Sequence, residues 1–254
     1  MKQIITFYLF LILSVGISYA QPAVNEILKK MEDNVSMSKD ARAQVSMTQQ
    51  KANQGTKVFD MMYYRRDKDN AFLVVLLAPE AEKGNGYLRV DDNFWMYRRN
   101  TRTFQHVNRD ENIGGSDASG EDFETRKLSE LYEPAEDSNG KEIIGSEKLG
   151  VIPVWKFELK AKVNDVSYPY RIMWVRQDNF LQLKEQSFSN SKTLMITSYF
   201  PKYTTVSGKY VPVKQMYIDE FEKGNKTIVE LSNIVIEDLD DKIFTKAYLE
   251  NLSK

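Results

Sequence analysis

The chain contains no cysteine and a single histidine, His106, among its 254 residues. The absence of cysteine excludes disulfide frameworks, thiolate zinc sites, iron–sulfur clusters and cysteine nucleophiles. One histidine also excludes a metal centre built from several imidazoles, and any serine, histidine and aspartate triad would have to use His106. We therefore expect no cofactor.

Neither sign of charge dominates. The 35 lysine and arginine residues are balanced by 36 aspartate and glutamate residues, for a formal net charge of −1. Proteins that bind nucleic acid neutralise its phosphates with an excess of basic side chains. The balanced charge predicts no nucleic-acid partner.

Long hydrophobic runs are missing after the first twenty residues. Those residues combine a positive charge at Lys2, a mostly apolar stretch and a small-x-small site ending at Ala20, which is the pattern of a secretory signal peptide. The apolar stretch is shorter than the roughly 20 residues that span a bilayer, so an uncleaved anchor is the less favoured alternative. We expect cleavage after Ala20, a periplasmic location, and no lipid on the mature chain because no cysteine follows the cleavage site.

The mature chain, residues 21–254, shows no linker, low-complexity tract or internal repeat, so we expect a single domain. Apolar residues at helical spacing predict a helix at 24–35, and the hydrophobic period then changes to two, which indicates strands. Turn residues separate the predicted strands, which span 42–50, 56–66, 71–78, 86–90, 94–98, 103–107, 141–149, 154–161, 168–176, 181–188, 193–203, 210–222 and 226–236.

Two more helices are predicted, at 120–132 and 246–252. Ser119 is a suitable N-cap for the first, and Glu121 and Asp122 place negative charge in its first turn. Many short antiparallel strands with few helices indicate a mainly β protein with some α structure. We expect a curved antiparallel sheet that forms a half-open, incomplete β-barrel covered by two or three helices.

Several predicted strands are apolar on both faces. Residues 72–77 are apolar throughout, and in 168–175 both alternating sets contain large apolar side chains. Such a strand must be covered on both faces, by helices or, on one face, by a ligand. The methionines inside the strands suit a cavity for variable apolar cargo, although an ordinary core is their commoner use.

The polar segment around His106 also contains the residue types of two other kinds of site. Ser116, Asp117 and His106 have the residue types of a triad, but the chain has no Gly-x-Ser-x-Gly turn, so we do not expect an enzyme. The segment from Asp110 to Glu121 has several positions of a calcium-binding loop. Because a strand and not a helix is predicted before it, calcium binding is left as an open alternative.

Two motifs resemble segments of a known family. Residues 91–97, Asp-Asp-Asn-Phe-Trp-Met-Tyr, resemble the Trp-x-Tyr hairpin of LolA-type periplasmic lipoprotein carriers. Residues 115–123, Gly-Ser-Asp-Ala-Ser-Gly-Glu-Asp-Phe, are similar to a segment of the LolA-like outer membrane lipoprotein-sorting protein family. The order of predicted elements agrees over nearly all of the mature chain. The family-motif residues are Gly115, Ser116, Asp117, Glu121 and Asp122.

The resemblance implies a LolA/LolB-like fold in which helices cover an apolar concavity that shelters acyl chains. Acylated lipoproteins or other lipids are the implied cargo, with an inner-membrane exporter and an outer-membrane acceptor as candidate partners and transient membrane contact. The chain departs from the family at Ala118 and Gly120, where the family has aromatic residues. A functional basic residue of the family corresponds to Arg65 or Arg66, although Asp67 replaces the proline that follows it.

The residues expected to contact lipid lie on the apolar strands. They are Met62, Tyr64, Val75, Trp95, Tyr97, Ile172, Trp174 and Ile196. Each could instead belong to an ordinary core, and a shift of one residue would exchange the two faces of a strand. The leading functional hypothesis is a periplasmic carrier, and the alternative is an interaction module on the same fold, such as an envelope sensor or an exporter's accessory subunit.

Overall fold

The computed structural model describes residues 21–123 and 127–253. The predicted signal peptide therefore lies outside the described residues. Helix α1 (Val24–Val35) has the predicted bounds, because its apolar residues recur on one side and are buried there. Helix α3 (Lys246–Leu252) also has the predicted bounds, and the Thr245 side chain caps it by accepting a hydrogen bond from the Tyr248 N–H.

The described chain forms one antiparallel sheet of fourteen strands. The first six are β1 (Ala41–Lys51), β2 (Gly55–Arg66), β3 (Ala71–Ala78), β4 (Gly86–Val90), β5 (Asn93–Arg98) and β6 (Thr103–His106). The other eight are β7 (Tyr132–Pro134), β8 (Ile144–Leu149), β9 (Ile152–Ala161), β10 (Tyr170–Arg176), β11 (Gln182–Phe188), β12 (Leu194–Val206), β13 (Lys209–Asp219) and β14 (Lys226–Ile236). Every predicted strand is present, and β7 is an addition.

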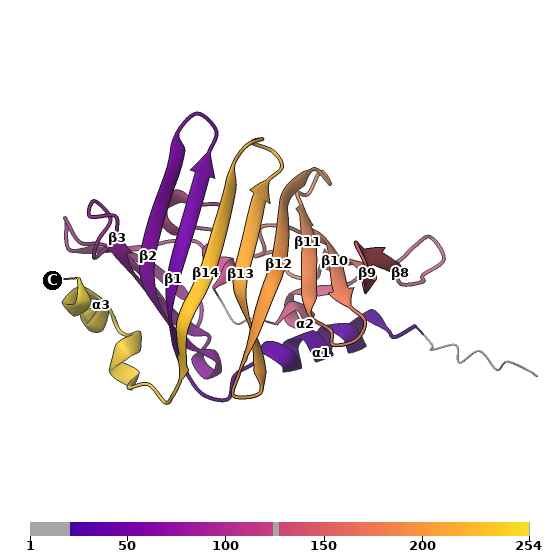
Figure 1. Ribbon diagram of the computed structural model, residues 1–254, viewed down its shortest axis with the longest axis horizontal. Coiled ribbons are helices and arrows are strands. Elements are labelled where there is room, and N and C mark those ends of the chain that lie inside the picture. The colour runs from indigo at the N-terminus through magenta and orange to yellow at the C-terminus, as the bar shows by residue number, and fades with distance from the viewer. Residues whose placement is uncertain (1–20, 124–126, 254) are drawn as a thin grey trace, which may run out of the picture.

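The sheet consists of two meanders, in each of which successive strands of the chain pair with one another. The two meanders are joined where β1 pairs with β14 at the centre of the sheet. The order across the sheet is β6-β5-β4-β3-β2-β1-β14-β13-β12-β11-β10-β9-β7, and β8 pairs with β9 beside β7. In Figure 1 the long central strands stand side by side, with α1 and α2 (Leu128–Leu131) along the lower edge and α3 at the left. The end strands do not pair with each other, so the sheet stays open. This confirms the predicted class of an incomplete barrel with helices.

The two faces of the sheet are covered differently. We call the face on which α1 packs the inner face, and the face on which α3 packs the outer face. On the inner face, α1 and α2 pack on β9 and β10 through buried side chains that include Leu28, Leu131 and Phe157. On the outer face, Leu249 of α3 packs with Val75 and other buried residues of β3 to β5. β3, which is apolar on both faces, has α3 on its outer face and buried apolar side chains of residues 113–123 on its inner face.

The segment between β6 and α2 covers the inner face of β1 to β5. Its side chains Ile113, Ala118 and Phe123 are buried with Phe72 and Phe94 of the sheet, whose ring centroids lie 5.5 Å apart. Short 3₁₀ turns at Ile113–Gly115 and Gly120–Asp122 shape this segment. We call residues 107–123 the inner loop.

The predicted helix at 120–132 was wrong as a continuous element. Ser119 and Asp122 do form a capping box, but it begins only the 3₁₀ turn Gly120–Asp122, and α2 is a separate four-residue helix. Phe123 packs in the cluster beside β2 to β5, whereas Leu131 packs with α1 and β9. Because these two residues are buried in different parts of the inner face, tertiary packing overrides the local helical pattern.

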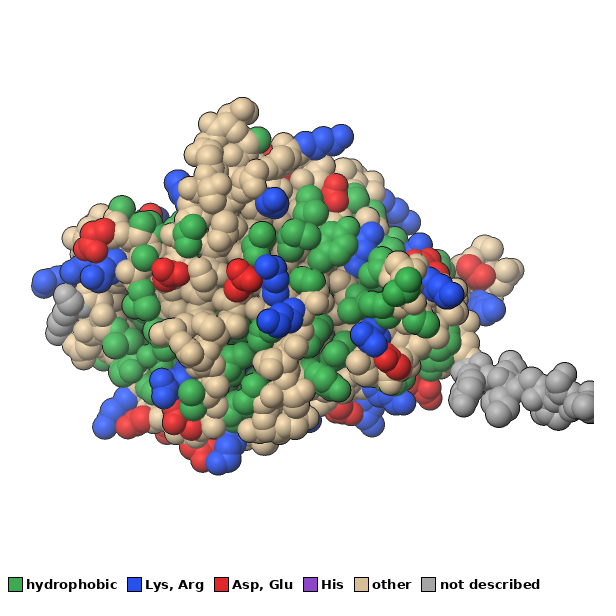
Figure 2. Space-filling view, in the orientation of Figure 1, with side chains coloured by type: hydrophobic (Ala, Val, Ile, Leu, Met, Phe, Trp, Pro, Cys, Tyr) green, Lys and Arg blue, Asp and Glu red, His purple; other side chains and the backbone are tan. Residues whose placement is uncertain are grey.

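The face of the molecule shown in Figure 2 carries hydrophobic side chains interspersed with Lys, Arg, Asp and Glu. Among the described residues, no helix combines the length and apolar composition needed to cross a bilayer.

Candidate functional site

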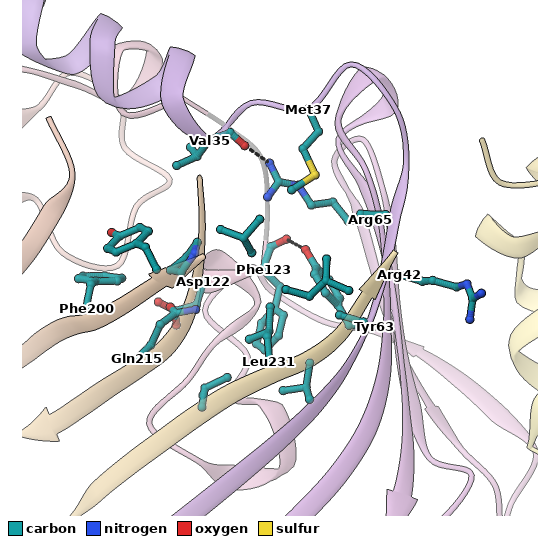
Figure 3. A pocket seen from close by; sticks show the side chains of 18 of the residues that line it. Val35, Met37, Arg42, Tyr63, Arg65, Asp122, Phe123, Phe200, Gln215 and Leu231 are labelled. Atoms are coloured by element: carbon teal, nitrogen blue, oxygen red, sulfur yellow. Dashed lines mark hydrogen bonds between the residues drawn. The ribbon is translucent and has the colours of Figure 1, made fainter. Parts of the chain in front are cut away.

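A hollow of about 290 Å³ lies on the inner face between the end of α1 and the central strands. We call it the central hollow. Its apolar lining consists of Val35, Met37, Ala41, Ala43, Val45, Phe123, Phe200, Val211, Pro212, Val229, Leu231 and Ile234. In Figure 3, Phe123, Leu231 and Tyr63 surround the space, whereas Arg42 points away from it. The small side chains of Ala41 and Ala43 leave room where the neighbouring clusters have large ones.

Two further hollows of about 300 Å³ each adjoin the central one. The first, which we call the entrance hollow, shares Val35, Met37, Arg65, Gln182 and Tyr203 with the central hollow. The second, which we call the polar hollow, shares Asp122 and Tyr217 with it and is lined mostly by carboxylates and hydroxyls. The inner face therefore has an apolar hollow with a polar hollow beside it.

Tyrosine hydroxyls at the hollows are hydrogen-bonded and neutral. The Tyr63 hydroxyl donates to the Phe123 carbonyl at 3.1 Å, and the Tyr203 hydroxyl donates to the Gln182 carbonyl at 2.9 Å. Burial raises the pKa of Tyr63 to about 12 and also raises the pKa of Tyr203. The two hydroxyl groups therefore add polar atoms to the mostly apolar wall of the central hollow without adding charge.

Arg65 lies where the central and entrance hollows meet. Its Nε is 2.5 Å from Asp67 Oδ1, and its Nη2 donates to the Val35 carbonyl at 3.4 Å. Asp67 in turn accepts from the Met37 N–H at 2.9 Å. Arg65 and Asp67 together attach the end of α1 to β2, so the predicted basic candidate that borders the hollows is Arg65.

Arg66 points to the opposite side of β2 and is only 4% exposed. Its guanidinium is 2.8 Å from Asp40, 2.7 Å from Asp241 and 4.4 Å from the Phe244 ring. It also donates to the Leu239 carbonyl at 2.6 Å. Arg66 therefore anchors the C-terminal segment and is remote from the hollow.

A charged network forms the wall of the polar hollow. Arg171 Nη1 donates to Glu185 at 2.7 Å, Nε donates to the Tyr132 hydroxyl at 2.8 Å, and Nη2 is 4.0 Å from Glu121. Burial lowers the pKa of Arg171, but the negative charges of Glu185 and Glu121 outweigh it and the pKa is raised. Arg171 thus keeps its charge.

Asp122 stands between the central and polar hollows. Its carboxylate accepts from the Ser119 N–H at 2.7 Å. The side chain is open to water inside the hollow, but the surrounding protein disfavours its charge and raises its pKa to about 6, against the opposing effects of that hydrogen bond and of Arg171.

The other family-motif residues attach the inner loop to the sheet. The Gly115 carbonyl accepts a hydrogen bond from Gln49, and the Asp117 carboxylate accepts from the Thr227 hydroxyl at 2.8 Å. Ser116 is buried and its hydroxyl bonds the Ala118 backbone. Glu121 accepts from the Ser167 hydroxyl at 2.9 Å. The motif therefore positions the loop that bounds the hollows.

The two departures from the family pattern are sites of close packing. Ala118 is fully buried. A Cβ on Gly120 would lie 2.6 Å from Phe94 Cε1 and 2.8 Å from the Arg109 carbonyl oxygen. No larger side chain fits at Gly120 unless Phe94 moves.

Seven of the eight predicted lipid contacts lie on the outer face, and none of the seven lines the central hollow. Tyr64, Val75, Trp95 and Tyr97 are packed near α3. Met62 is paired with Val75 and shares its face, while Ile172 and Trp174 alternate with inner-face residues of β10. Ile196 alone lies on the inner face, at the polar hollow. Alternation does not tell the two faces apart where both are apolar, so lipid contact at these seven residues stays a prediction.

The sequence reasoning missed the residues that do line the central hollow, among them Val45, Val211 and Leu231. One signal for the correct face was available on β9. There Lys156, Glu158 and Lys160 alternate with the inner-face residues, so the charged set marks the outer face. Trp174 is paired with Lys156 and therefore shares that outer face.

The segment considered for calcium or catalysis is folded differently from either site. The side chains of Asp117 and Glu121 bond to Thr227 and Ser167 on separate parts of the molecule. His106 is exposed at the end of β6 with its ring edge-on to Trp95, at 6.0 Å between centroids. In residues 21–123 and 127–253, no group of three or more His, Asp or Glu side chains is placed to hold a metal ion.

The open antiparallel sheet with an inner hollow defines the class as a LolA-like fold. It is similar to a LolA superfamily protein from Nitrosomonas europaea, with 19% identity over 90% of this chain and 100% of that chain and a TM-score of 0.76. It is also similar to an outer membrane lipoprotein-sorting protein domain from Vibrio parahaemolyticus, with 17% identity over 89% and 97% and a TM-score of 0.77. A DUF1329 family protein from Desulfovibrio piger has 20% identity over 89% and 98% and a TM-score of 0.78.

A family model with the description "Uncharacterized protein" matches residues 68–251. Because this match spans more than half of the chain, the chain belongs to that family. No curated protein matches the chain in sequence. The solved structures confirm the predicted resemblance to the LolA-like fold, which was based on residues 91–97 and 115–123.

Proposed function

We propose that this chain is a periplasmic carrier that shelters the acyl chains of lipoproteins or other lipids during transfer toward the outer membrane. The observation that carries the proposal is the apolar central hollow, which the side chains of the described residues leave open. The predicted signal peptide, cleaved after Ala20, would bring the chain to the periplasm. The fold shared with lipoprotein-sorting proteins supports the same role.

The energetics of acyl chains explain why such a carrier needs a hollow of this kind. Each CH₂ group removed from water contributes about 0.8 kcal/mol, so a multiply acylated molecule does not cross an aqueous compartment unaided. Small-molecule sites commonly have about 300 to 1,000 Å³, and the central hollow with its neighbours falls in this range. An open hollow covers the chains in transit and still allows their release to an acceptor.

The proposal is tested with the purified mature protein. Organic extraction followed by mass spectrometry is expected to recover bound lipid. A neutral fluorescent probe, N-phenyl-1-naphthylamine, is expected to bind and to be displaced by lipids. Recovery of no lipid together with no probe binding would rule the carrier function out.

Two variants on one strand separate ligand binding from folding. Leu231 lines the central hollow, whereas Ile228 lies on the outer face of β14 opposite Thr48, and both are half-buried. Leu231→Asp is expected to weaken probe binding at least tenfold, because it places a charge in the apolar wall. Ile228→Asp is the matched control and should bind the probe like the parent. If Leu231→Asp and Ile228→Asp bind the probe equally well, the probe does not bind in the central hollow.

Crosslinking in cells distinguishes the carrier from the interaction module. A photo-reactive residue in place of Phe200, which lines the hollow, is expected to capture many different lipoproteins. Capture of one protein partner in equal amount would instead indicate an exporter or sensor subunit.

A further inference from the structure

The polar hollow contains more negative than positive charge. Its lining includes the carboxylates of Asp110, Asp117, Glu121 and Asp122, and among the described lining residues Arg171 is the one basic side chain. The hollow adjoins the apolar central hollow at Asp122 and Tyr217. A molecule with its hydrocarbon part in the central hollow would therefore place its head group against an acidic wall.

Arg171 is not available to bind an anionic head group. Its three guanidinium nitrogens are directed to Tyr132, Glu185 and Glu121, at 2.8, 2.7 and 4.0 Å. Glu185 and Glu121 already compensate its single positive charge. A phosphate in the polar hollow would gain little from Arg171 and would be repelled by the remaining carboxylates.

Ser198 provides a second observation, independent of the carboxylates. It lines the polar hollow, is only 6% exposed, and lies opposite Tyr217 on β13. Within the described parts of the chain, no residue forms a hydrogen bond with its hydroxyl. The side chain is more than nine-tenths buried, and it lines the hollow with no partner for its hydroxyl among the described residues, so the hydroxyl can bond to a molecule there.

The carboxylates retain capacity for additional donors. Asp117 accepts from Thr227, Glu121 from Ser167, and Asp122 from Ser119. An ionised carboxylate has about four acceptor positions, so each can accept further hydrogen bonds.

We infer that the carried molecule is an amphiphile whose head group donates hydrogen bonds and bears no negative charge, an amine or a polyol, and that this head group occupies the polar hollow. The inference rests on the proposed carrier function and names its substrate class. The apolar hollow selects for a hydrocarbon tail, and the polar hollow selects the head group.

The test uses three amphiphiles with the same twelve-carbon tail, each below its micelle concentration: dodecylamine, dodecyl maltoside and dodecyl phosphate. Each is titrated against the full mature protein at pH 7 in the presence of N-phenyl-1-naphthylamine. Dodecylamine, dodecyl maltoside or both are expected to displace the probe at concentrations at least tenfold lower than dodecyl phosphate. The amine and maltoside arms show which donor head group is preferred.

Two variants locate the selectivity in the polar hollow. The double variant Glu121→Gln with Asp122→Asn keeps the oxygen acceptors for Ser167 and Ser119 but removes two charges. It is expected to reduce the preference for dodecylamine over dodecyl phosphate at least threefold. Ser198→Ala is expected to weaken the binding of dodecyl maltoside at least twofold. Glu230→Gln, which removes a charge paired with Lys214 on the outer face, is the control and should leave all ratios unchanged.

The possible failures are distinguishable. If neither the probe nor any amphiphile binds, the carrier function fails and the inference fails with it. If all three bind with similar strength, or dodecyl phosphate binds best, the hollow carries lipids but the head-group inference is wrong. Unchanged ratios in the double variant and in Ser198→Ala, with thermal unfolding showing that both are folded, would also overturn it.

Discussion

Two regions of the same inner face are occupied in opposite ways. Beside β2 to β5, the inner loop packs Ile113, Ala118 and Phe123 on the sheet, where they are buried. Beside β12 to β14, described side chains such as Phe200 and Leu231 border the central hollow. The apolar face of a sheet must be covered by something. Phe123 packs in the filled region and also lines the central hollow, so the two regions meet at this side chain.

The largest effect is expected from truncating an aromatic ring in each region. Phe72 is 1% exposed in the filled region and contacts Phe94 and Phe123. Phe72→Ala should lower the free energy of unfolding by about 3–5 kcal/mol. Phe200→Ala, in the open region, should cost less than about 1 kcal/mol because the ring already borders empty space, and it should weaken probe binding. Urea denaturation measures both, and equal destabilisation would contradict the comparison.

The adjacent Arg65 and Arg66 at the end of β2 allow the stability of a buried side chain to be compared with that of a side chain at the hollows. Arg66→Ala should lower the free energy of unfolding by about 3 kcal/mol, since it leaves Asp40 without its buried partner. Arg65 is one-fifth exposed at the hollows, so Arg65→Ala should cost less and should mainly alter probe binding by releasing the end of α1. A larger loss of stability for Arg65→Ala than for Arg66→Ala in urea denaturation would show that these roles are reversed.

The strands could be predicted from sequence because local turn chemistry marks their ends. The strands at 71–78, 86–90 and 226–236 have the predicted bounds. Asn70 and Asp91, which flank two of them, adopt positive φ angles of 41° and 50°. Asn and Asp tolerate this conformation better than most residues, which is why they are frequent in the turns between strands. The open-barrel class followed from the number and length of these strands.

The lining of the hollow could not be predicted in the same way. Val75 and Leu76 are neighbours on β3, both buried, yet one packs under α3 and the other under the inner loop. Alternation alone does not say which face is inner when both are apolar. The choice depends on where α3 and the inner loop return to the sheet, and these are contacts between residues far apart in the chain. The helix predicted at 120–132 is interrupted for the same reason, because contacts with distant parts of the chain decide where Phe123 and Leu131 are buried.

A smaller effect is expected from adding one methyl group in the filled region. Gly120→Ala should lower the free energy of unfolding by about 1–3 kcal/mol, because its Cβ would lie 2.6 Å from Phe94 Cε1. Gly145 on β8 is the control, because a Cβ there meets nothing within 4 Å. Gly145→Ala should therefore be close to neutral in thermal and urea unfolding. If Gly120→Ala were equally neutral, the filled region would be looser than its contacts indicate.

The smallest effect is a pH dependence at the boundary of the open region. The surrounding protein raises the pKa of Asp122 to about 6 in the folded protein, above the ordinary value of an aspartate, although the side chain is open to water in the hollow; folding therefore favours the protonated form. Ionisation of Asp122 therefore lowers the free energy of unfolding. This loss is absent below about pH 4, grows as the pH rises toward 6, and is constant above that. Asp122→Asn keeps an oxygen for the Ser119 N–H and removes the charge. The parent should therefore lose stability relative to this variant, by on the order of 1 kcal/mol after solvent screening, when urea denaturation is compared between pH 4 and pH 7. If the difference in free energy of unfolding between the parent and Asp122→Asn stays constant over this range, or favours the parent as the pH rises, the prediction is wrong. Asp122 would then be as well solvated as a surface carboxylate, and the hollow would not disfavour its charge.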